Sequence, residues 1–450
     1  MTAIHWFRRD LRLADNPALL AAGAGGRDVV PLFVLDDALL ARSGAPRRAY
    51  LLRSLRALDD ATGGRLVVRR GTPAEVVPDV AQEVTADEVH VASSYEPAGR
   101  RRDEQVRSAL EAQGTALVAT GSPYAVAPGR LLTGGGTPFQ VFTPFRTAWL
   151  AHGWRAPATG PAPRWAEGVR SDGLPDEPGL DGLELPEAGE DAARERWAAM
   201  LDDGLPGYAD DRNRPDLDAT SRLSPALKWG EIHPRTLLAD LARRRSDGAA
   251  AFRSELAWRE FHADVLFHHP TASWESLREV APADSWVAGD REAAALEVWA
   301  DGRTGYPFVD AGMRQLRAEG WMHGRLRMVT ASFLIKDLHV AWQRGAAHFM
   351  RWLVDGDVPQ NQLNWQWVAG TGRDAAPYFR VFNPVTQGRT LDPDGTYVRR
   401  WVPELRGIPG VAVHEPWKLP RAAAPDYPER VVDHAAERKA ALDAHARRSR

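Results

Sequence analysis

The first 125 residues alternate short apolar, β-branched runs with stretches of helical periodicity. This alternation predicts a doubly wound, Rossmann-like parallel sheet, because a parallel strand is reached through a crossover that is usually a helix. No Gly-x-Gly-x-x-Gly pattern follows any of the runs, which excludes a standard dinucleotide-binding turn. The expected strands span residues 4–7, 29–35, 66–68, 89–92 and 116–119.

The composition changes twice further along the chain. Gly and Pro become frequent between residues 128 and 190, in TGGGTP and APATGPAPRW, which is typical of a long connecting segment. From residue 191 the apolar residues recur at three- and four-residue spacing, as in TASFLIKDLHVAW, which predicts helices. We therefore expect an α/β domain at 1–127, a linker at 128–190 and an all-α domain at 191–450.

Composition narrows the possible functions only in part. The 450 residues exceed one ordinary core, which agrees with two domains. There is no apolar run of bilayer length and no signal-peptide pattern, so we expect a cytoplasmic protein that does not enter membranes. The lack of cysteine excludes disulfides and thiolate chemistry but not an organic cofactor. The net charge of −3 does not decide on DNA binding, since a basic face can be balanced elsewhere.

A short polar segment in the helical half has the composition of an anion site. Its hydroxyl groups and its arginine lead to Ser224, which we expect to cap a helix that begins at Pro225 and directs free N–H groups at a pyrophosphate. A simple helix N-cap is the alternative, because Ser-Pro starts are common. The segment is Thr220, Ser221, Arg222, Leu223 and Ser224.

Further polar and aromatic residues are concentrated in the same half. Glu255, Trp258 and Arg259 stand at i, i+3 and i+4 and share a helix face, although a core tryptophan beside a surface ion pair has the same spacing. The Asp-Gly-Asp at 355–357 lacks the other ligands of a calcium loop, so hydrogen bonding to a polar ligand is favoured and no metal is expected. The remaining candidates are Arg325, Arg327 and Met328, Asp355, Asp357 and Asn361, and Trp365 and Trp367.

The run from Thr304 to Trp417, with TGYPFVDAGMRQLRAEGWMHGRLRMVTASFLIKDL, DAAPYFRVFNPVTQG and HEPW, resembles the cryptochrome and photolyase family. WFRRDLRLADNPAL and LFVLDD near the N-terminus match as well, so the resemblance covers nearly the whole chain. Within the family it is nearest to the class I cyclobutane pyrimidine dimer photolyases. It implies an α/β antenna domain, a long linker and a helical domain that binds FAD and the DNA lesion.

The resemblance also implies roles for the candidate cofactor residues. Asn361 matches the position that faces flavin N5, where asparagine is typical of repair enzymes and plant-type cryptochromes have aspartate. Arg327 and Asp355 match an ion pair beside the flavin, and Asp357 a contact to its polar groups. The remaining matches are Tyr208 and the Thr220–Ser224 segment, for the FAD phosphates and ribitol, and Trp258 and Arg259, for the rim of the cofactor pocket.

The implied reaction is light-driven repair of UV-damaged DNA by a monomeric enzyme. Excited reduced FAD (FADH⁻) donates an electron to a flipped-out pyrimidine dimer, the cyclobutane ring splits, and the electron returns. Glu255 is expected to hydrogen-bond the lesion, and Trp258 and Trp367 to stack on it. The other implied contacts to lesion or phosphates are Met328, Arg212, Arg325 and Arg380, each arginine being a plain surface residue in the alternative interpretation.

Two positions depart from the family pattern. Gly324 stands where repair enzymes usually have asparagine, which removes a polar group from the lesion pocket. Trp365 and Trp342 match the inner two of the three tryptophans that recharge the flavin, but the outer position holds Gly289, with Trp286 as a candidate replacement. Core packing is the alternative for every tryptophan, and we prefer it for Trp229, Trp321 and Trp352.

The sequence also favours one antenna chromophore, and it favours dimer repair over the alternative functions. Ala98-Gly99 replaces the Asn-Glu of folate-binding relatives and EPAGRRRD is more similar to deazaflavin binders, so deazaflavin is favoured, with Asp36 and Arg47 or Arg53 as contacts. Glu255 and Met328 favour cyclobutane dimers over 6-4 photoproducts as the substrate. Relatives that act on 6-4 photoproducts have glutamine at the position of Glu255 and a His-His pair at positions 323–324. The absence of a long tail favours an enzyme over a cryptochrome-type photoreceptor, and no second redox motif supports a light-independent flavoprotein.

Overall fold

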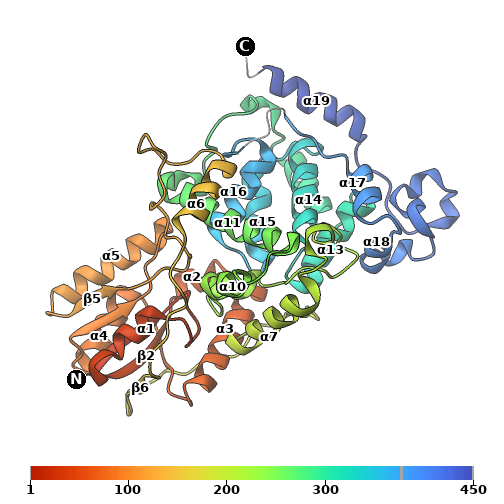
Figure 1. Ribbon diagram of the computed structural model, residues 1–450. Helices are drawn as coiled ribbons and strands as arrows, with labels where there is room; N and C mark the ends of the chain where they lie inside the picture. Colours follow the sequence, from red (N-terminus) through yellow and green to blue (C-terminus); the bar gives the residue numbers. More distant parts are fainter. Residues whose placement is uncertain (1, 375–378, 448–450) are drawn as a thin grey trace. The chain divides into compact units, whose positions relative to one another are not determined.

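The computed structural model of the chain describes residues 2–374 and 379–447. The chain groups into two compact units. Unit 1 consists of residues 1–180, 186–206 and 221–270, and unit 2 of residues 181–185, 207–220 and 271–450. Unit 1 therefore combines the α/β region with the first helices of the helical half. Figure 1 colours the ribbon along the sequence, from red at the N-terminus to blue at the C-terminus.

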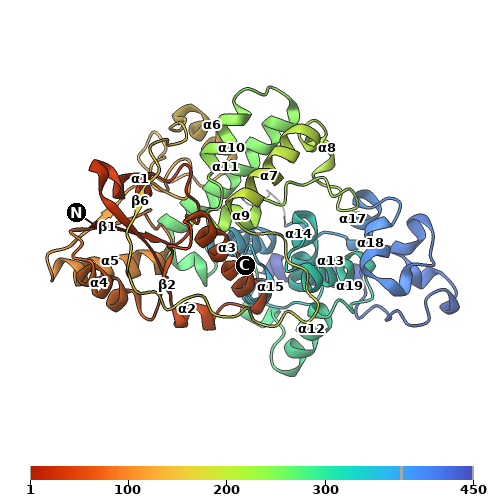
Figure 2. The ribbon, with the colours of Figure 1, turned by 90° about the horizontal axis from the view of Figure 1, so that it is seen from below.

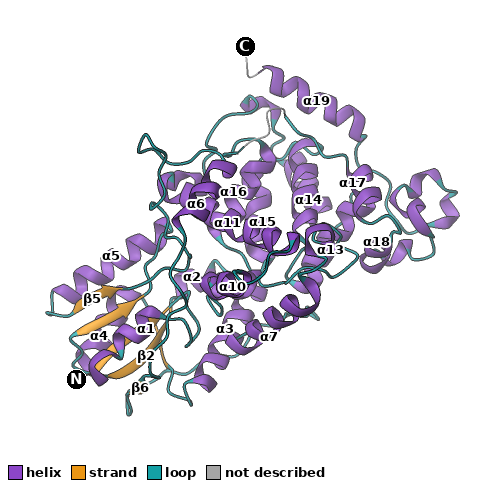
Figure 3. Cartoon of the chain, viewed as in Figure 1, coloured by secondary structure: helices purple, strands orange, loops and turns teal. Residues whose placement is uncertain are grey.

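A parallel sheet in unit 1 confirms the predicted α/β fold. Its five main strands follow the order β3-β2-β1-β4-β5, and every pairing is parallel (Figure 3). A sixth strand, β6 (Arg164–Trp165), pairs with β2; it has only two residues, too few for a periodic pattern to reveal it. The main strands are β1 (Thr2–Phe7), β2 (Asp28–Leu35), β3 (Val67–Arg70), β4 (Glu88–Val91) and β5 (Ala116–Ala119).

Both faces of this sheet are covered by apolar packing. Along β1, Ile4 and Trp6 belong to one buried cluster, and Ala3 and Phe7 belong to another. Successive residues of a strand point to opposite faces, so two clusters require helices on both sides of the sheet. These helices are α1 (Pro17–Ala22), α2 (Asp37–Ala41), α3 (Ala45–Ala61), α4 (Pro73–Glu83) and α5 (Pro97–Glu111).

Unit 1 also contains a helix inside the predicted linker. Helix α6 (Phe142–His152) buries Phe142, Phe145 and Trp149, which stand at i, i+3 and i+7 and so share one face. It lies beside α11 in both views of the ribbon (Figures 1 and 2). The other helices of the unit are α7 (Glu190–Ala199), α9 (Ser224–Trp229), α10 (Pro234–Leu241) and α11 (Asp247–His268), with a π-helical turn at Met200–Gly204.

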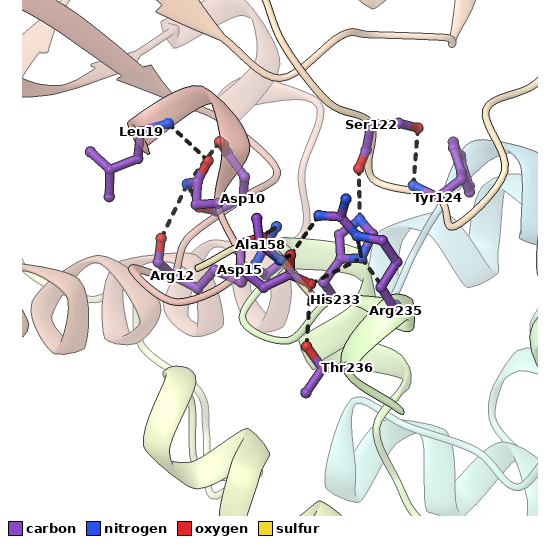
Figure 4. A network of polar contacts seen from close by, with 12 residues as sticks. Asp10, Arg12, Asp15, Leu19, Ser122, Tyr124, Ala158, His233, Arg235 and Thr236 are labelled. Atoms are coloured by element: carbon purple, nitrogen blue, oxygen red, sulfur yellow. Dashed lines mark hydrogen bonds and ion pairs between the residues drawn. The ribbon is translucent and has the colours of Figure 1, made fainter. Parts of the chain in front are cut away.

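A buried polar network joins three parts of unit 1 (Figure 4). One carboxylate oxygen of Asp15 accepts hydrogen bonds from Arg235 Nη2 at 2.6 Å and from the amide of Ala158 at 2.7 Å. His233 donates through Nε2 to the carbonyl of Ser122 at 2.7 Å and accepts the Arg235 amide at Nδ1. Burial and three nearby arginines hold the pKa of His233 well below its usual value, which agrees with a ring that donates at Nε2 and accepts at Nδ1. The network fixes the loop after β1 against α10.

In the described residues of unit 2 the regular elements are helices, which confirms the all-α prediction. Trp299, Phe333 and Trp365 lie in its large apolar core, which also includes the side chain of Trp352 at its margin. Over the described part of the chain, no helix combines the length and apolarity needed to cross a bilayer. The helices are α8 (Tyr208–Asp211), α12 (Asp290–Ala300), α13 (Pro307–Glu319), α14 (Gly324–Lys336), α15 (Trp342–Trp352), α16 (Val358–Ala369), α17 (Pro384–Leu391), α18 (Thr396–Trp401) and α19 (His434–Arg447).

Candidate functional site

An ion pair in unit 2 joins two of the predicted site residues. Arg327 on α14 donates two hydrogen bonds to Asp355, from Nη1 to Oδ1 at 3.2 Å and from Nη2 to Oδ2 at 2.7 Å. Its Nε donates to the carbonyl of Met322 at 2.8 Å. The Asp355 side chain is only 2% exposed, whereas that of Arg327 is 27% exposed. The fork geometry therefore fixes a buried carboxylate and leaves part of the guanidinium accessible.

The amide of Asn361 has a defined orientation. Asn361 is buried on α16, and its Nδ2 donates to the carbonyl of Ala346 at 3.0 Å and to Oε1 of Gln362 at 2.8 Å. Both amide hydrogens are thus directed at the protein, and the group that Asn361 presents to a ligand is its oxygen, an acceptor. Asp357, also buried, stands at the N-cap of the same helix. The side-chain oxygens of Asn361 and Asp357 are acceptors, which fits a ligand that offers an N–H group.

The predicted tryptophans of unit 2 are held by specific contacts. Trp365 is buried on α16, with its ring centroid 6.1 Å from that of Trp299 and 5.0 Å from that of Phe349. A Cβ at Gly345 would lie 2.1 Å from Cη2 of Trp365, so glycine is required for this close packing. Trp342, at the start of α15, donates from Nε1 to Ser276 at 3.0 Å. The fully buried Trp299 was not assigned a functional role from the sequence.

The structure gives a physical reason for the missing outer tryptophan. Gly289 is the N-cap of α12 with φ 62° and ψ −138°, a conformation that is essentially restricted to glycine. A tryptophan at this position would strain the backbone. Trp286, three residues earlier, is half-buried against the core of unit 2. Its role as the replacement stays a prediction.

Lesion-side candidates are gathered at the start of α14. His323 caps this helix by accepting the amide of Arg325 at Nδ1, and the Arg325 side chain donates to Asn213 at 2.7 Å and to the sulfur of Met328 at 4.0 Å. Gly324 is exposed, and a Cβ added there would meet no described atom within 4 Å. The substitution of glycine for asparagine has therefore not been compensated by a neighbour that fills the space.

Five further candidates of unit 2 lie outside this group. Arg380 is exposed, and its backbone carbonyl accepts a hydrogen bond from the buried Lys336. Burial lowers the pKa of Lys336 to about 7. The half-buried Trp367 donates from Nε1 to the carbonyl of Asp374 at 3.0 Å. Tyr208, buried, begins α8 and Arg212 directly follows this helix, while Thr220 is half-buried.

In unit 1, Trp258 and Arg259 on α11 make contacts in different directions. Arg259 is buried and donates to the carbonyls of Pro123 and Leu227 at 3.1 and 3.0 Å. The half-buried indole of Trp258 instead stacks on Phe142 of α6, with ring centroids 3.7 Å apart. Glu255, half-buried, lies one turn earlier on the same helix. The guanidinium of Arg259 thus ties α11 to its neighbours, and its role at the cofactor stays a prediction.

The cap expected at Ser224 is wrong. Helix α9 begins at Ser224 itself, and Leu223, with φ −80° and ψ −2°, occupies the N-cap position without a side-chain hydrogen bond. The turn is formed earlier, where Arg222 adopts a positive φ of 49° and Ser221 Oγ accepts the amide of Leu223 at 3.4 Å. The nearly helical dihedrals of Leu223 extend the helix start by one residue, which removes Ser224 from the capping position.

A buried carboxylate that sequence reasoning missed connects α11 to α6. Glu260 accepts the amides of Ala125 and Val126 and the indole Nε1 of Trp149, the last at 2.6 Å. Burial outweighs these three donors and raises the pKa of Glu260 to about 7. One turn later Asp264 accepts the amide of Gly129 at 2.7 Å. The signal in the sequence was a pair of carboxylates four residues apart, at the start and in the middle of the largely apolar stretch EFHADVLF.

Comparison with known proteins identifies the family of the chain. The family of DNA photolyases matches residues 3–164, and the FAD binding domain of DNA photolyase matches residues 252–447. A deoxyribodipyrimidine photo-lyase of Streptomyces griseus is 46% identical over 449 residues, which cover 97% of each chain. The chain belongs to the photolyase and cryptochrome family. The resemblance stated from the sequence motifs is thereby confirmed.

Solved structures of the photolyase and cryptochrome family agree with the fold. A bacterial class III photolyase from Agrobacterium tumefaciens superposes with a TM-score of 0.90 at 36% identity, covering 99% of this chain and 97% of the other. A cryptochrome from Synechocystis gives 0.88 at 28% identity, covering 98% and 99%. The family's FAD-binding domain in this chain includes α11 and α12–α19, and so contains Glu255, Arg327 and Asn361.

Proposed function

We propose that the chain is a deoxyribodipyrimidine photo-lyase that repairs cyclobutane pyrimidine dimers in DNA with light and reduced FAD. The observation that carries the proposal is the fixed amide of Asn361, which presents an acceptor inside a photolyase-type FAD-binding domain. An acceptor suits the N5–H of a reduced flavin. The names of relatives that are similar over nearly the full chain support the same activity.

The residues proposed to hold FAD have complementary chemistry. The exposed part of the Arg327 guanidinium offers positive charge beside a flavin that is reduced and anionic, while Asp355 fixes its position. Asp357 is proposed to accept from polar groups of the cofactor. When bound, the reduced flavin supplies the electron that enters the dimer under light and recovers it after ring opening. Proposed contacts to the phosphates and ribitol are Tyr208, Thr220, Ser221, Arg222, Leu223 and Ser224.

The lesion is proposed to meet a second set of residues. Glu255 donates a hydrogen bond to a carbonyl of the dimer and so stabilises the extra negative charge on it, and Trp258 and Trp367 stack on its bases. Arginines are proposed to contact DNA phosphates, which makes affinity fall with salt. These arginines are Arg212, Arg325 and Arg380. No general base is needed, because the bonds break after electron transfer.

A second chromophore in the α/β region is also proposed, with deazaflavin favoured over folate. Of the expected contacts, Asp36 caps α2 by accepting the amide of Ala38 at 2.9 Å, and Arg53 pairs with Glu177 at 3.0 Å. Arg47 is buried. Reconstitution of the purified protein with a deazaflavin or a folate, read by energy transfer to FAD, distinguishes the two.

The reaction is tested with purified protein that contains reduced FAD. Blue light is expected to remove thymine dimers from an oligonucleotide, and a dark sample is the control. Unchanged dimers under light, with FAD bound and reduced, would contradict repair. That outcome would instead favour a photoreceptor, the function suggested by the similarity to a cryptochrome.

Glu255→Gln is expected to slow repair while FAD stays bound. Glutamine keeps the volume but replaces the carboxyl O–H with a weaker amide donor, so the dimer with its extra electron loses stabilisation of about 1.5–3 kcal/mol, or about 10- to 150-fold in rate. Repair rate per absorbed photon and FAD absorbance measure the two effects. An unchanged rate would remove Glu255 from the mechanism.

Gly324→Asn is expected to tighten binding of dimer-containing DNA. The added side chain meets no steric obstacle at the start of α14. One new hydrogen bond corresponds to about 2- to 10-fold in Kd. Titration of damaged and undamaged oligonucleotides measures it, and equal tightening for both would show that the asparagine does not contact the lesion.

Trp365→Phe is expected to abolish light-driven reduction of oxidised FAD. Phenylalanine preserves the apolar packing of this buried site but lacks the oxidisable indole. Repair by chemically reduced protein should remain. Trp229→Phe, at a half-buried position packed against a core of unit 1, is the control. Photoreduction at the wild-type rate in Trp365→Phe would show that the electron takes another route.

A further inference from the structure

One face of the Trp258 indole is covered by an aromatic residue of α6. Phe142, the first residue of that helix, is 8% exposed and stacks on Trp258 with centroids 3.7 Å apart and planes inclined by only 9°. Phe261 meets the same indole at 75°, in a T-shaped contact with centroids 5.8 Å apart. His262 lies beside the same ring, with centroids 5.5 Å apart and planes inclined by 43°, and Trp258 as a residue stays half-buried.

Helix α6 is held in place without the help of Trp258. Phe145, one turn after Phe142, packs on Phe261 with centroids 5.2 Å apart. Two turns after Phe142, Trp149 donates its Nε1 hydrogen to the buried Glu260 at 2.6 Å. These contacts, both on the C-terminal side of the stack in α6 and in α11, anchor the two helices to each other. The position of the Phe142 ring is therefore set by the helix, and the ring in turn restricts the plane of the indole.

We infer that Phe142 is a positioning residue that holds the Trp258 indole ready to stack on a base of the flipped-out pyrimidine dimer. This inference rests on the proposed function, in which Trp258 contacts the lesion. The base would form the third layer of a stack whose first two layers exist before DNA arrives. An aromatic side chain that is ordered in advance loses little freedom on binding, and this raises affinity without any contact between Phe142 and DNA.

The inference is tested with Phe142→Leu in the FAD-containing full-length protein. Leucine keeps an apolar side chain at the start of α6 but provides no flat ring. We expect Kd for an oligonucleotide with one thymine dimer to rise about 3- to 10-fold, the equivalent of one side chain that must be immobilised on binding. Kd for the undamaged oligonucleotide and the FAD content should stay unchanged, and KM should change more than kcat.

Two matched variants separate positioning from general packing. Phe145→Leu removes a ring from the same helix but leaves the ring of Phe142 and the hydrogen bond from Trp149 to Glu260 that still anchors α6, so the affinity for damaged DNA should stay at the wild-type level. Phe142→Tyr restores a flat ring and should restore the affinity. Equal weakening in Phe142→Leu and Phe145→Leu, or no recovery in Phe142→Tyr, would overturn the inference.

Trp258→Leu distinguishes failure of this inference from failure of the proposed function. If Trp258→Leu weakens binding of damaged DNA and Phe142→Leu does not, only the role of Phe142 is overturned. If Trp258→Leu has no effect, the proposed contact of Trp258 with the lesion is wrong and the inference falls with it. Weakening in both variants, with wild-type behaviour of Phe145→Leu, supports the stack.

Discussion

Arg327→Met is expected to destabilise the protein by about 3–5 kcal/mol, because it leaves the carboxylate of Asp355 buried without its partner. Asp355 is 2% exposed and accepts both hydrogen bonds of the guanidinium fork, so water has little access to the abandoned charge. Methionine retains the apolar stem of arginine, which limits the loss of packing. Urea unfolding of the FAD-free protein, followed by tryptophan fluorescence, measures the change.

The partner variants define the origin of this effect. Asp355→Asn should cost less, because the arginine side chain left behind is 27% exposed and its charge can be hydrated. The double variant Arg327→Met with Asp355→Leu removes both charges and should recover most of the loss. A destabilisation below about 1 kcal/mol in Arg327→Met would mean that the pair is solvated and does not act as a buried ion pair.

Glu260→Ala is expected to cost a similar amount, about 3–6 kcal/mol, since up to three buried N–H groups lose their acceptor at about 1–3 kcal/mol each. Two of these groups belong to the backbone at residues 125 and 126, and the third is the indole of Trp149. Glu260→Gln retains one acceptor oxygen and should cost about half as much. Thermal and urea unfolding measure both, and near-wild-type stability of Glu260→Ala would contradict a structural role.

The raised pKa of Glu260 predicts how the stability of the protein depends on pH. The pKa of Glu260 is raised to about 7 in the folded protein, above its ordinary 4.5, so the folded state retains a proton that the unfolded state releases. The stability from this group is fully present below about pH 4.5 and is lost as the pH rises through about 7, a change of about 3 kcal/mol. The stability difference between wild type and Glu260→Gln should therefore shrink from pH 4.5 to pH 8. A constant difference would show that Glu260 is charged throughout.

The sequence was sufficient where a feature depends on local pattern. The five main strands, the helical second half and the proximity of Arg327 to Asp355 were all expected, the last from resemblance and the others from periodicity. Membership of the photolyase and cryptochrome family was also readable, because its motifs are long. Local patterns survive folding when they reflect which face of an element is buried.

Other features were hidden because they depend on partners distant in the chain. Helix α6 was read as part of a linker, since the Gly and Pro on both sides dominated the composition and the residues it packs against lie more than a hundred positions later. Glu260 was overlooked for the same reason, because only folding supplies its three donors. Ser224 was misplaced by one residue, because the dihedrals of Leu223 decide where α9 begins.

The amino-acid sequence by itself determined the fold class, the family and the FAD-binding character of the helical half, since these follow from periodicity and from long motifs. Tertiary structure alone decided how the side chains are oriented. It directed both amide hydrogens of Asn361 to groups of the protein, directed Arg259 to backbone carbonyls, and placed Phe142 on Trp258. The physical reason is that hydrogen-bond direction and ring stacking depend on atoms brought together by packing, which no spacing along the chain encodes.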